Sequence, residues 1–312
     1  MLITVTFNPA IDKTAEVDSL QFGALNRLRN VIMDAGGKGV NVSKTIAALG
    51  GTSICTGFLA GSSGKYIEDT LKQLNIQSDF VWVEGMTRTN LKVLDKDMEL
   101  TELNEAGPVI DTKQVQELMD KLVLLCEEGS YVVLSGNVSP GVDSSIYYEM
   151  IQRIQKEKAH VVLDADGELF AQGIKAEPSV IKPNKYELAS YFGLEQDVEN
   201  HTIVTHAKTL LKGNTKLVAV SMGKEGSIFI TADGVWQAEA LSIQAHSSVG
   251  AGDAMVAAMT YALQERYPME ELMRLAVATS AGAVMTKGTQ PAKREIVEEL
   301  MKNVIIRKWE DA

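Results

Sequence analysis

The segment Ser248-Val249-Gly250-Ala251-Gly252-Asp253 leads directly into an almost wholly apolar run, Ala254–Met259. This pattern predicts a glycine turn at the start of a buried helix. Glycines in that position leave backbone N–H groups uncovered at the positive end of the helix, where they can hold an anion. Asp253 would then lie beside this anion hole.

The anion hole and the aspartate together suit phosphoryl transfer. The N–H groups of Gly250, Ala251 and Gly252 can oppose the growing charge on a transferring phosphoryl group, while Asp253 takes a proton from the attacking hydroxyl. The segment alone leaves a second interpretation open, in which the glycines form an ordinary turn and Asp253 only complements the helix dipole. Residues elsewhere in the chain have to decide between the two.

Two other phosphate-binding loops are excluded by their spacing. A Walker A loop ends in Gly-Lys-Ser/Thr, but Tyr66 follows Gly64-Lys65 here and the glycine spacing is also wrong. A dinucleotide fingerprint needs a third glycine where Met255 stands, and Gly250 lies near the wrong end of the chain. The sequence therefore supports neither a P-loop NTPase nor a Rossmann dehydrogenase.

Short β-branched runs alternate with helical patterns along most of the chain. Several runs are almost continuously apolar, which is typical of parallel strands covered on both faces by helices. The expected strands are Ile3–Phe7, Ser53–Gly57, Tyr131–Leu134, His160–Leu163, Val180–Ile181 and Lys216–Val220. Helical spacing occurs at Val42–Leu49, Tyr66–Leu74, Gln114–Cys126, Ile146–Gln155, Asp253–Arg266, Met269–Met285 and about Arg294 to Lys302. This alternation predicts a doubly wound α/β domain over residues 1–312, with a mostly parallel sheet flanked by helices.

Two segments, residues 12–34 and 79–105, break this alternation. Polar and apolar residues alternate in them with no helix between, as in Phe80-Val81-Trp82-Val83 and Asn90-Leu91-Lys92-Val93-Leu94. Such segments suit strands with one covered and one exposed face. We expect the two to pair into one small antiparallel β-sheet that forms a lid over the site.

The composition limits the class of protein. The 312 residues are 45% hydrophobic, enough for a large core, and 30 basic against 41 acidic residues give a net charge of −11. This charge disfavours nucleic acids and anionic membranes as partners. Cys55 and Cys126 lie in apolar stretches and are expected to be buried, reduced thiols. No signal peptide or membrane span is recognisable, so we expect a cytoplasmic location.

A second glycine cluster, Gly36-Gly37-Lys38-Gly39, leads into the helix expected to end near Leu49. Three glycines in four positions permit close approach of the backbone to a ligand, and Lys38 and Asn41 add a cation and an amide. The alternative is a flexible turn with a solvated lysine.

The two clusters together resemble the signatures of the ribokinase-like sugar kinases, the PfkB family. Ser247–Asp253 is similar to part of the family's C-terminal signature, and Gly36–Ser43 to most of its N-terminal one. The resemblance covers essentially the whole chain and departs at Ala60, where the family usually has a second glycine. It implies a ribokinase-like fold, ATP and Mg²⁺ as cofactors, and Asp253 as general base beside the anion hole.

Within that family the chain looks like the branch of 1-phosphofructokinase and tagatose-6-phosphate kinase. Asn8-Pro9-Ala10-Ile11-Asp12 is similar to the branch's opening, in which the aspartate binds substrate hydroxyls. The resemblance implies that Lys38, Arg27 and Arg88 surround a substrate phosphate, because arginine matches phosphate oxygens in two places and lysine supplies a point charge. The implied substrate-binding residues are Asp12, Arg27, Gly37, Lys38, Asn41, Arg88 and Asn90.

Two further elements resemble the nucleotide side of the family's site. Lys182-Pro183-Asn184-Lys185-Tyr186-Glu187 looks like the element whose Asn and Glu, here Asn184 and Glu187, organise Mg²⁺ through water. Asn184 can at the same time cap the following helix. Val220–Gly226 resembles the strand and turn that line the nucleotide. The implied nucleotide-binding residues are Lys182, Asn184, Ser221, Gly223, Gly226, Gly250 and Gly252.

The substrate is narrowed by two short segments. Thr87–Val93 and Thr101–Glu105 look more like 1-phosphofructokinase than tagatose-6-phosphate kinase. We therefore expect ATP-dependent conversion of fructose 1-phosphate to fructose 1,6-bisphosphate, with tagatose 6-phosphate as the alternative acceptor. A non-catalytic sugar-phosphate sensor is the rival from another class, but its expected mark, loss of the base or the anion-hole glycines, is absent. The resemblance also implies that the lid can form a homodimer interface.

Overall fold

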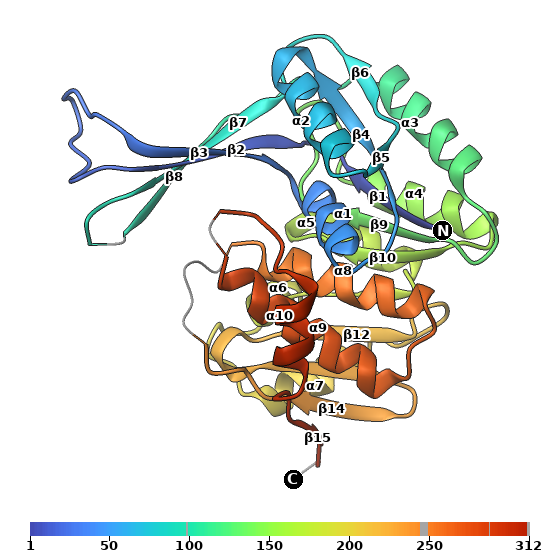
Figure 1. Cartoon of the computed structure of the whole chain (residues 1–312). Coiled ribbons are helices and arrows are strands. Elements are labelled where there is room, and N and C mark those ends of the chain that lie inside the picture. The colour runs from blue at the N-terminus through green and yellow to red at the C-terminus, as the bar shows by residue number, and fades with distance from the viewer. Residues whose placement is uncertain (98, 244–248, 287, 311–312) are drawn as a thin grey trace.

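The computed structural model describes residues 1–97, 99–243, 249–286 and 288–310, which form two β-sheets with helices around the larger one (Figure 1). The large sheet has the strand order β15-β14-β13-β12-β11-β10-β9-β1-β4-β5, and β6 pairs with β4. Its strands are β1 (Leu2–Thr6), β4 (Ile54–Ala60), β5 (Gln77–Ser78), β6 (Val81–Val83), β9 (Tyr131–Ser135), β10 (His160–Asp164), β11 (Val180–Ile181), β12 (Leu217–Ser221), β13 (Ser227–Thr231), β14 (Gly234–Ala238) and β15 (Ile306–Lys308).

The large sheet is mostly parallel, as the sequence predicts. Every pairing from β12 across to β5 and β6 is parallel, and β13, β14 and β15 add an antiparallel edge. The sequence prediction missed these three edge strands. Along β9, Val132 and Leu134 enter one core and Val133 the other, which explains the continuous apolar runs.

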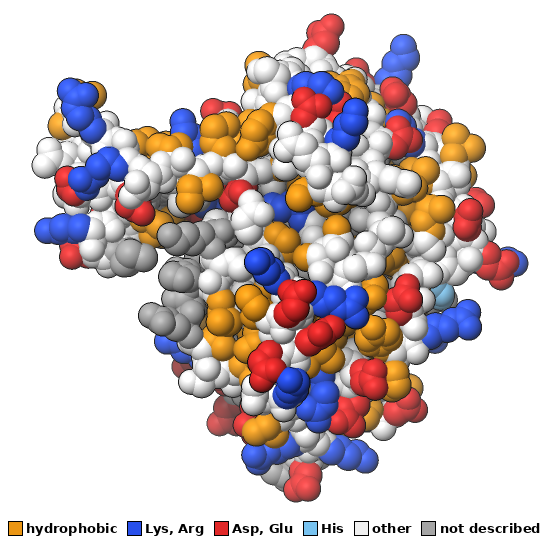
Figure 2. All heavy atoms as spheres, viewed as in Figure 1, with side chains coloured by type: hydrophobic (Ala, Val, Ile, Leu, Met, Phe, Trp, Pro, Cys, Tyr) orange, Lys and Arg blue, Asp and Glu red, His pale blue; other side chains and the backbone are white. Residues whose placement is uncertain are grey.

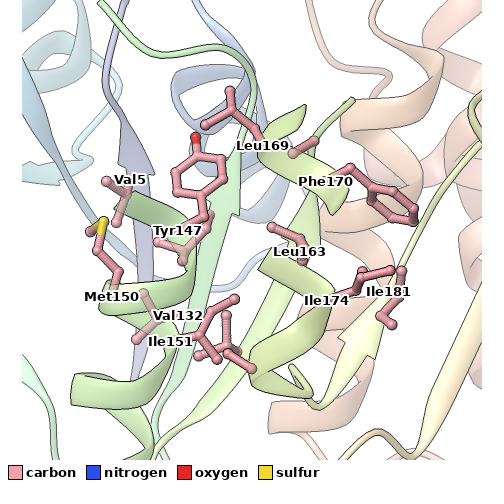
Figure 3. Packing of buried hydrophobic residues seen from close by; sticks show 14 of the residues in the cluster. Val5, Val132, Tyr147, Met150, Ile151, Leu163, Leu169, Phe170, Ile174 and Ile181 are labelled. Atoms are coloured by element: carbon pink, nitrogen blue, oxygen red, sulfur yellow. The ribbon is translucent and has the colours of Figure 1, made fainter. Parts of the chain in front are cut away.

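Helices cover both faces of this sheet. One face carries α1 (Lys38–Ala48), α2 (Gly61–Gln73), α8 (Ala251–Gln264), α9 (Met269–Val284) and α10 (Arg294–Met301). The other carries α3 (Thr112–Leu125), α4 (Ile146–Lys156), α5 (Gly167–Gly173), α6 (Lys185–Tyr191) and α7 (Asn200–Lys208), with the 3₁₀ turns η1 (Ile174–Ala176) and η2 (Gly223–Glu225). Figure 3 shows the core between the sheet and this second group of helices, where Tyr147 and Met150 of α4 and Phe170 of α5 pack on the sheet. The doubly wound α/β fold is confirmed.

The small sheet projects from this body (Figure 1) and has the order β3-β2-β7-β8. Its strands are β2 (Ala10–Glu16), β3 (Arg29–Gly36), β7 (Arg88–Leu94) and β8 (Leu100–Asn104). The prediction of an antiparallel sheet is wrong for the central pair, since β2 and β7 are parallel. β2 follows β1, and β7 follows β6. Because β1 and β6 both run parallel to β4 in the large sheet, the segments that continue into β2 and β7 leave the body in the same direction.

The stretch Phe80-Val81-Trp82-Val83 was also expected in the small sheet, and this prediction is wrong. Val81–Val83 forms β6, which pairs with β4 in the body. Phe80 and Val81 are both buried, so their apolar side chains join the core instead of the projecting sheet.

Several surface features complete the description. Figure 2 shows hydrophobic side chains on the projecting small sheet, where exposed residues include Phe22, Leu25, Val31, Ile32, Met33 and Leu103. Both cysteines are unpaired; Cys55 is buried as expected, but Cys126 is partly exposed. Among the described residues, no helix has the length and apolar character needed to cross a membrane.

Candidate active site

Helix α8 begins at Ala251, directly after Gly250, whose backbone conformation favours glycine. Gly250 is the N-cap residue with φ of 84°, in the left-handed region that favours glycine. Within the described part of the chain, no side chain covers the first N–H groups of α8, as expected for an anion hole. Ser248, part of the same predicted segment, lies outside the described residues.

Asp253 lies in the first turn of α8 and is buried. The Asn41 amide of α1 donates to its Oδ2 over 2.9 Å, which fixes the orientation of the carboxylate. Burial raises the pKa of Asp253 to about 6, and the negative charge of Asp164 adds to this rise, whereas Lys38, Asn41 and Lys182 oppose it. At neutral pH the group is a carboxylate whose proton affinity suits a general base.

The glycines at the start of α1, Gly37 and Gly39, allow tight packing within the protein itself. Gly37 has φ of 103°, and a Cβ on it would lie 2.9 Å from the Pro9 Cα. A Cβ on Gly39 would lie 2.6 Å from the Val5 carbonyl oxygen of β1. These close backbone contacts bring Lys38 and Asn41 to the end of the sheet, and Gly37 itself lines the cavity described below.

Lys38 and Lys182 share one buried carboxylate. Asp164, the last residue of β10, lies 3.2 Å from the Lys38 Nζ and 3.1 Å from the Lys182 Nζ. Burial by itself would raise the pKa of Asp164, but Lys182 and Lys38 outweigh it and hold that pKa well below its usual range. A Cβ on Gly252 would lie 3.4 Å from the Lys182 Nζ. Both ammonium groups are therefore fixed at the end of the cavity that contains the anion hole.

The small sheet presents a polar face to the same cavity. The Asn90 amide donates to the Asp12 Oδ1 over 3.1 Å, and the Lys92 Nζ lies 3.4 Å from the Asp12 Oδ2. Arg88 donates to the backbone carbonyl oxygens of Asn8 and Glu105, which flank the small sheet. Among the described residues, the buried Oδ1 atoms of Asn41 and Asn90 have no hydrogen-bond partner, so each can accept a hydrogen bond from a ligand hydroxyl.

The nucleotide-side residues form the opposite wall. Asn184 and Glu187 make a capping box at the start of α6, in which the Asn184 Oδ1 accepts from the Glu187 N–H and the Glu187 Oε2 accepts from the Asn184 N–H, both over 2.8 Å. The helix-capping interpretation of Asn184 is thereby confirmed. Gly223 has no atom within 4 Å of an added Cβ, so its backbone is open to a ligand.

These walls enclose a cavity of about 530 Å³ between the small sheet and the body. Its lining includes all the predicted site residues except Arg27: Asp12, Gly37, Lys38, Asn41, Arg88, Asn90, Lys182, Asn184, Glu187, Ser221, Gly223, Gly226, Gly250, Ala251, Gly252 and Asp253. A larger groove beside α3, about 810 Å³, is lined mainly by charged and amide side chains of that helix and contains none of these groups.

The three residues expected around the substrate phosphate lie in different places in this chain. Arg27 lies exposed in the loop between β2 and β3 and does not line the cavity. Lys38 does line it, but Asp164 holds its ammonium at the anion-hole end. Arg27, Lys38 and Arg88 therefore do not gather around one point.

A family model described as pfkB family carbohydrate kinase matches residues 5–296. The chain belongs to this family. It is 32% identical over 307 residues to the 1-phosphofructokinase of Bacillus subtilis, covering 97% of this chain and 98% of that protein. It is 35% identical to the 1-phosphofructokinase of Xanthomonas campestris over 285 residues, 89% of either chain. The tagatose-6-phosphate alternative has no counterpart among these relatives.

Solved structures agree with the fold of this family. Phosphofructokinase-2 from Escherichia coli, in complex with potassium, superposes with a TM-score of 0.91 at 26% identity, over 97% of this chain and 98% of that one. A tetrameric inhibited form of the same relative matches with a TM-score of 0.89. This PfkB kinase therefore shares the ribokinase-like architecture throughout.

Sequence reasoning missed several cavity residues of this PfkB kinase. Lys92 lines the cavity with Arg88 and Asn90, and Glu102 and Asn104 line it from β8. The available signal was the period of two along a strand, which puts Arg88, Asn90 and Lys92 on one face. Asp164 is not part of the lining, but it holds two lysines that are, and its position at the carboxyl end of a parallel strand could have indicated it.

Proposed function

We propose that this protein is an ATP-dependent 1-phosphofructokinase that converts fructose 1-phosphate to fructose 1,6-bisphosphate. The observation that carries the proposal is one cavity with a buried carboxylate, Asp253, at an uncovered helix N-terminus and a polar sheet face opposite. The relatives named 1-phosphofructokinase over nearly the full chain support the choice of acceptor.

Asp253 acts as the general base. Its carboxylate, oriented by Asn41, takes the proton from the free C6 hydroxyl of the sugar as that oxygen attacks the γ-phosphorus. The bond from the γ-phosphorus to the β,γ-bridging oxygen breaks, and ADP leaves. The N–H groups that follow Gly250 and the ammonium of Lys38 oppose the charge on the transferring group.

The sugar is held between the body and the small sheet, which acts as a lid. Asp12 accepts from sugar hydroxyls while Asn90 keeps its carboxylate in place. The Oδ1 atoms of Asn41 and Asn90, which lack a partner in the described part of the chain, accept hydrogen bonds from further sugar hydroxyls. Closure of the lid over the ligands would exclude water, which otherwise competes as phosphoryl acceptor.

The residues present fit Mg²⁺ at the nucleotide side. Glu187 uses one carboxylate oxygen in the capping box and lines the cavity, so the other oxygen remains for a hard cation or its water ligands. Asn184 would assist from the same turn. The metal, when bound, shields phosphate charge. Asp164 does not fit this role because two lysines already hold its carboxylate.

We propose that residues 1–312 act as one catalytic unit in the cytoplasm and pair through the lid. The exposed apolar side chains of the small sheet, among them Val31, Ile32 and Met33, suit contact with a second copy. Sedimentation of the purified chain at micromolar concentration tests this, and a monomer would contradict it.

A coupled ADP-release assay with purified protein tests the substrate. We expect a clear kcat/KM preference for fructose 1-phosphate over tagatose 6-phosphate and fructose 6-phosphate. A preference for either of the other two acceptors would refute the proposal.

A further inference from the structure

The cations that line the cavity fall into two pairs. Lys38 and Lys182 are tied to Asp164 at the anion-hole end. Arg88 and Lys92 lie on β7 of the lid. An acceptor whose reacting hydroxyl lies at Asp253 carries its existing phosphate at the far end of the sugar. Since Lys38 and Lys182 are held at the anion-hole end, Arg88 and Lys92 are the described lining cations that remain for that phosphate.

We infer that Lys92 binds the phosphate already present on the acceptor, together with Arg88, and so selects phosphorylated sugars. This inference rests on the proposed function and names the specificity residue of the same site. Lys92 would contact the phosphate directly, by a charge-assisted hydrogen bond from its ammonium.

The strand register places Lys92 on the correct face. In the lid, Asn90 stands opposite Asp12 and Asn104, and Lys92 stands opposite Thr14 and Glu102. Arg88 and Lys92 flank Asn90 at two positions on either side, and their Cα atoms are about 13 Å apart at the usual rise of a strand. Two long side chains separated in this way can converge on one phosphate above Asn90.

The surroundings of Lys92 call for an anion. The residue is only 8% exposed, yet among the described residues its ion-pair partner is Asp12 alone, at the long distance of 3.4 Å. An ammonium has three N–H donors, so donors remain for a ligand. A buried cation so incompletely paired is costly to the free protein, and a bound phosphate would relieve this cost.

The same geometry also allows Lys92 to act only by positioning Asp12, and the two roles predict different results. If Lys92 only positions Asp12, its replacement weakens the binding of every sugar that contacts Asp12. If Lys92 binds the phosphate, its replacement weakens the binding of phosphorylated sugars and leaves the binding of an unphosphorylated furanose unchanged.

The test compares Lys92→Gln with wild type on fructose 1-phosphate. We expect KM for fructose 1-phosphate to rise roughly 10- to 100-fold, the size of a lost charge-assisted hydrogen bond, while KM for ATP changes less than about twofold. Lys92→Arg keeps the cation and should stay within about fivefold of wild type. Lys96→Gln makes the same charge change at an exposed position beyond β7 and should leave KM unchanged.

Binding of 2,5-anhydro-D-mannitol, an unphosphorylated furanose, separates the two roles of Lys92. Calorimetry should give the same Kd for Lys92→Gln and wild type. Equal weakening of this ligand and of fructose 1-phosphate would overturn the inference, as would an unchanged KM for fructose 1-phosphate. A wrong substrate assignment shows separately, in the wild-type acceptor screen.

Discussion

Replacement of Asp164 by asparagine tests how the anion-hole end of the cavity is held together. The change keeps the size of the side chain and removes the negative charge that Lys38 and Lys182 share. The Lys182 side chain is 4% exposed and would remain buried without its ion-pair partner, whereas that of Lys38, at 38%, can be hydrated. Removing one partner of a buried pair costs roughly 3 to 5 kcal/mol, so with Lys38 partly hydrated we expect a loss of about 3 kcal/mol.

This loss translates into a measurable change in melting temperature. Unfolding entropies near 2.1 cal/mol/K per residue give about 0.66 kcal/mol/K for 312 residues, so Tm should fall by about 5 °C in scanning calorimetry. Asp166→Asn makes the same charge change at an exposed position two residues away and should shift Tm by less than about 1 °C.

The same variant should also change the pH dependence of catalysis. The charge of Asp164 contributes to the raised pKa of Asp253, so removing it should lower that pKa. The acid limb of the kcat profile then moves to lower pH, an effect that a purely structural role for Asp164 does not predict. A Tm within about 1 °C of wild type together with an unmoved acid limb would refute the reasoning.

Three further predictions concern the base and its neighbour. Asp253→Asn should lower kcat at least ~10²-fold while the Kd of fructose 1-phosphate, measured by calorimetry, stays nearly unchanged; near-normal turnover would remove Asp253 from its role. In wild type, the carboxylate form of a base whose pKa is about 6 is lost as pH falls, so kcat at saturating substrates should be roughly tenfold lower at pH 5 than at pH 8, and a flat profile would contradict this. Lys38→Ala should lower kcat and raise KM for ATP more than KM for the sugar phosphate, because Asp164 holds this ammonium at the anion-hole end. Steady-state kinetics with both substrates varied measures the two KM values, and a larger rise in KM for the sugar phosphate would contradict this prediction.

The elements with a strong local pattern could be predicted from the sequence. Gly250 before an apolar run predicted both the left-handed turn and the uncovered start of α8. The apolar runs predicted the parallel strands, because both faces of β9 enter a core. The capping role of Asn184 followed from its position before a helix.

The features that depend on tertiary direction could not be predicted in this way. Alternation along β2 and β7 indicates two-faced strands but carries no information on whether they run parallel. Lys38 follows a glycine turn, and the sequence does not indicate whether its long side chain faces the lid or the body. In the structure its ammonium forms an ion pair with Asp164 of the body. Arg27 was placed by analogy of position alone, and the loop after β2 carries it to the surface.

The pairing of β2 with β7, which are far apart in the sequence, has a consequence for folding during synthesis. The lid draws its strands from residues 10–36 and 88–104, so it cannot form until both have left the ribosome and the strands between them have begun to pair. The catalytic base arrives much later, since Asn41 contacts Asp253 across 212 positions of sequence. Contacts so distant in sequence slow folding. A nascent chain therefore contains the strands of the sugar-facing sheet well before it contains Asp253, and phosphoryl transfer must wait for that residue.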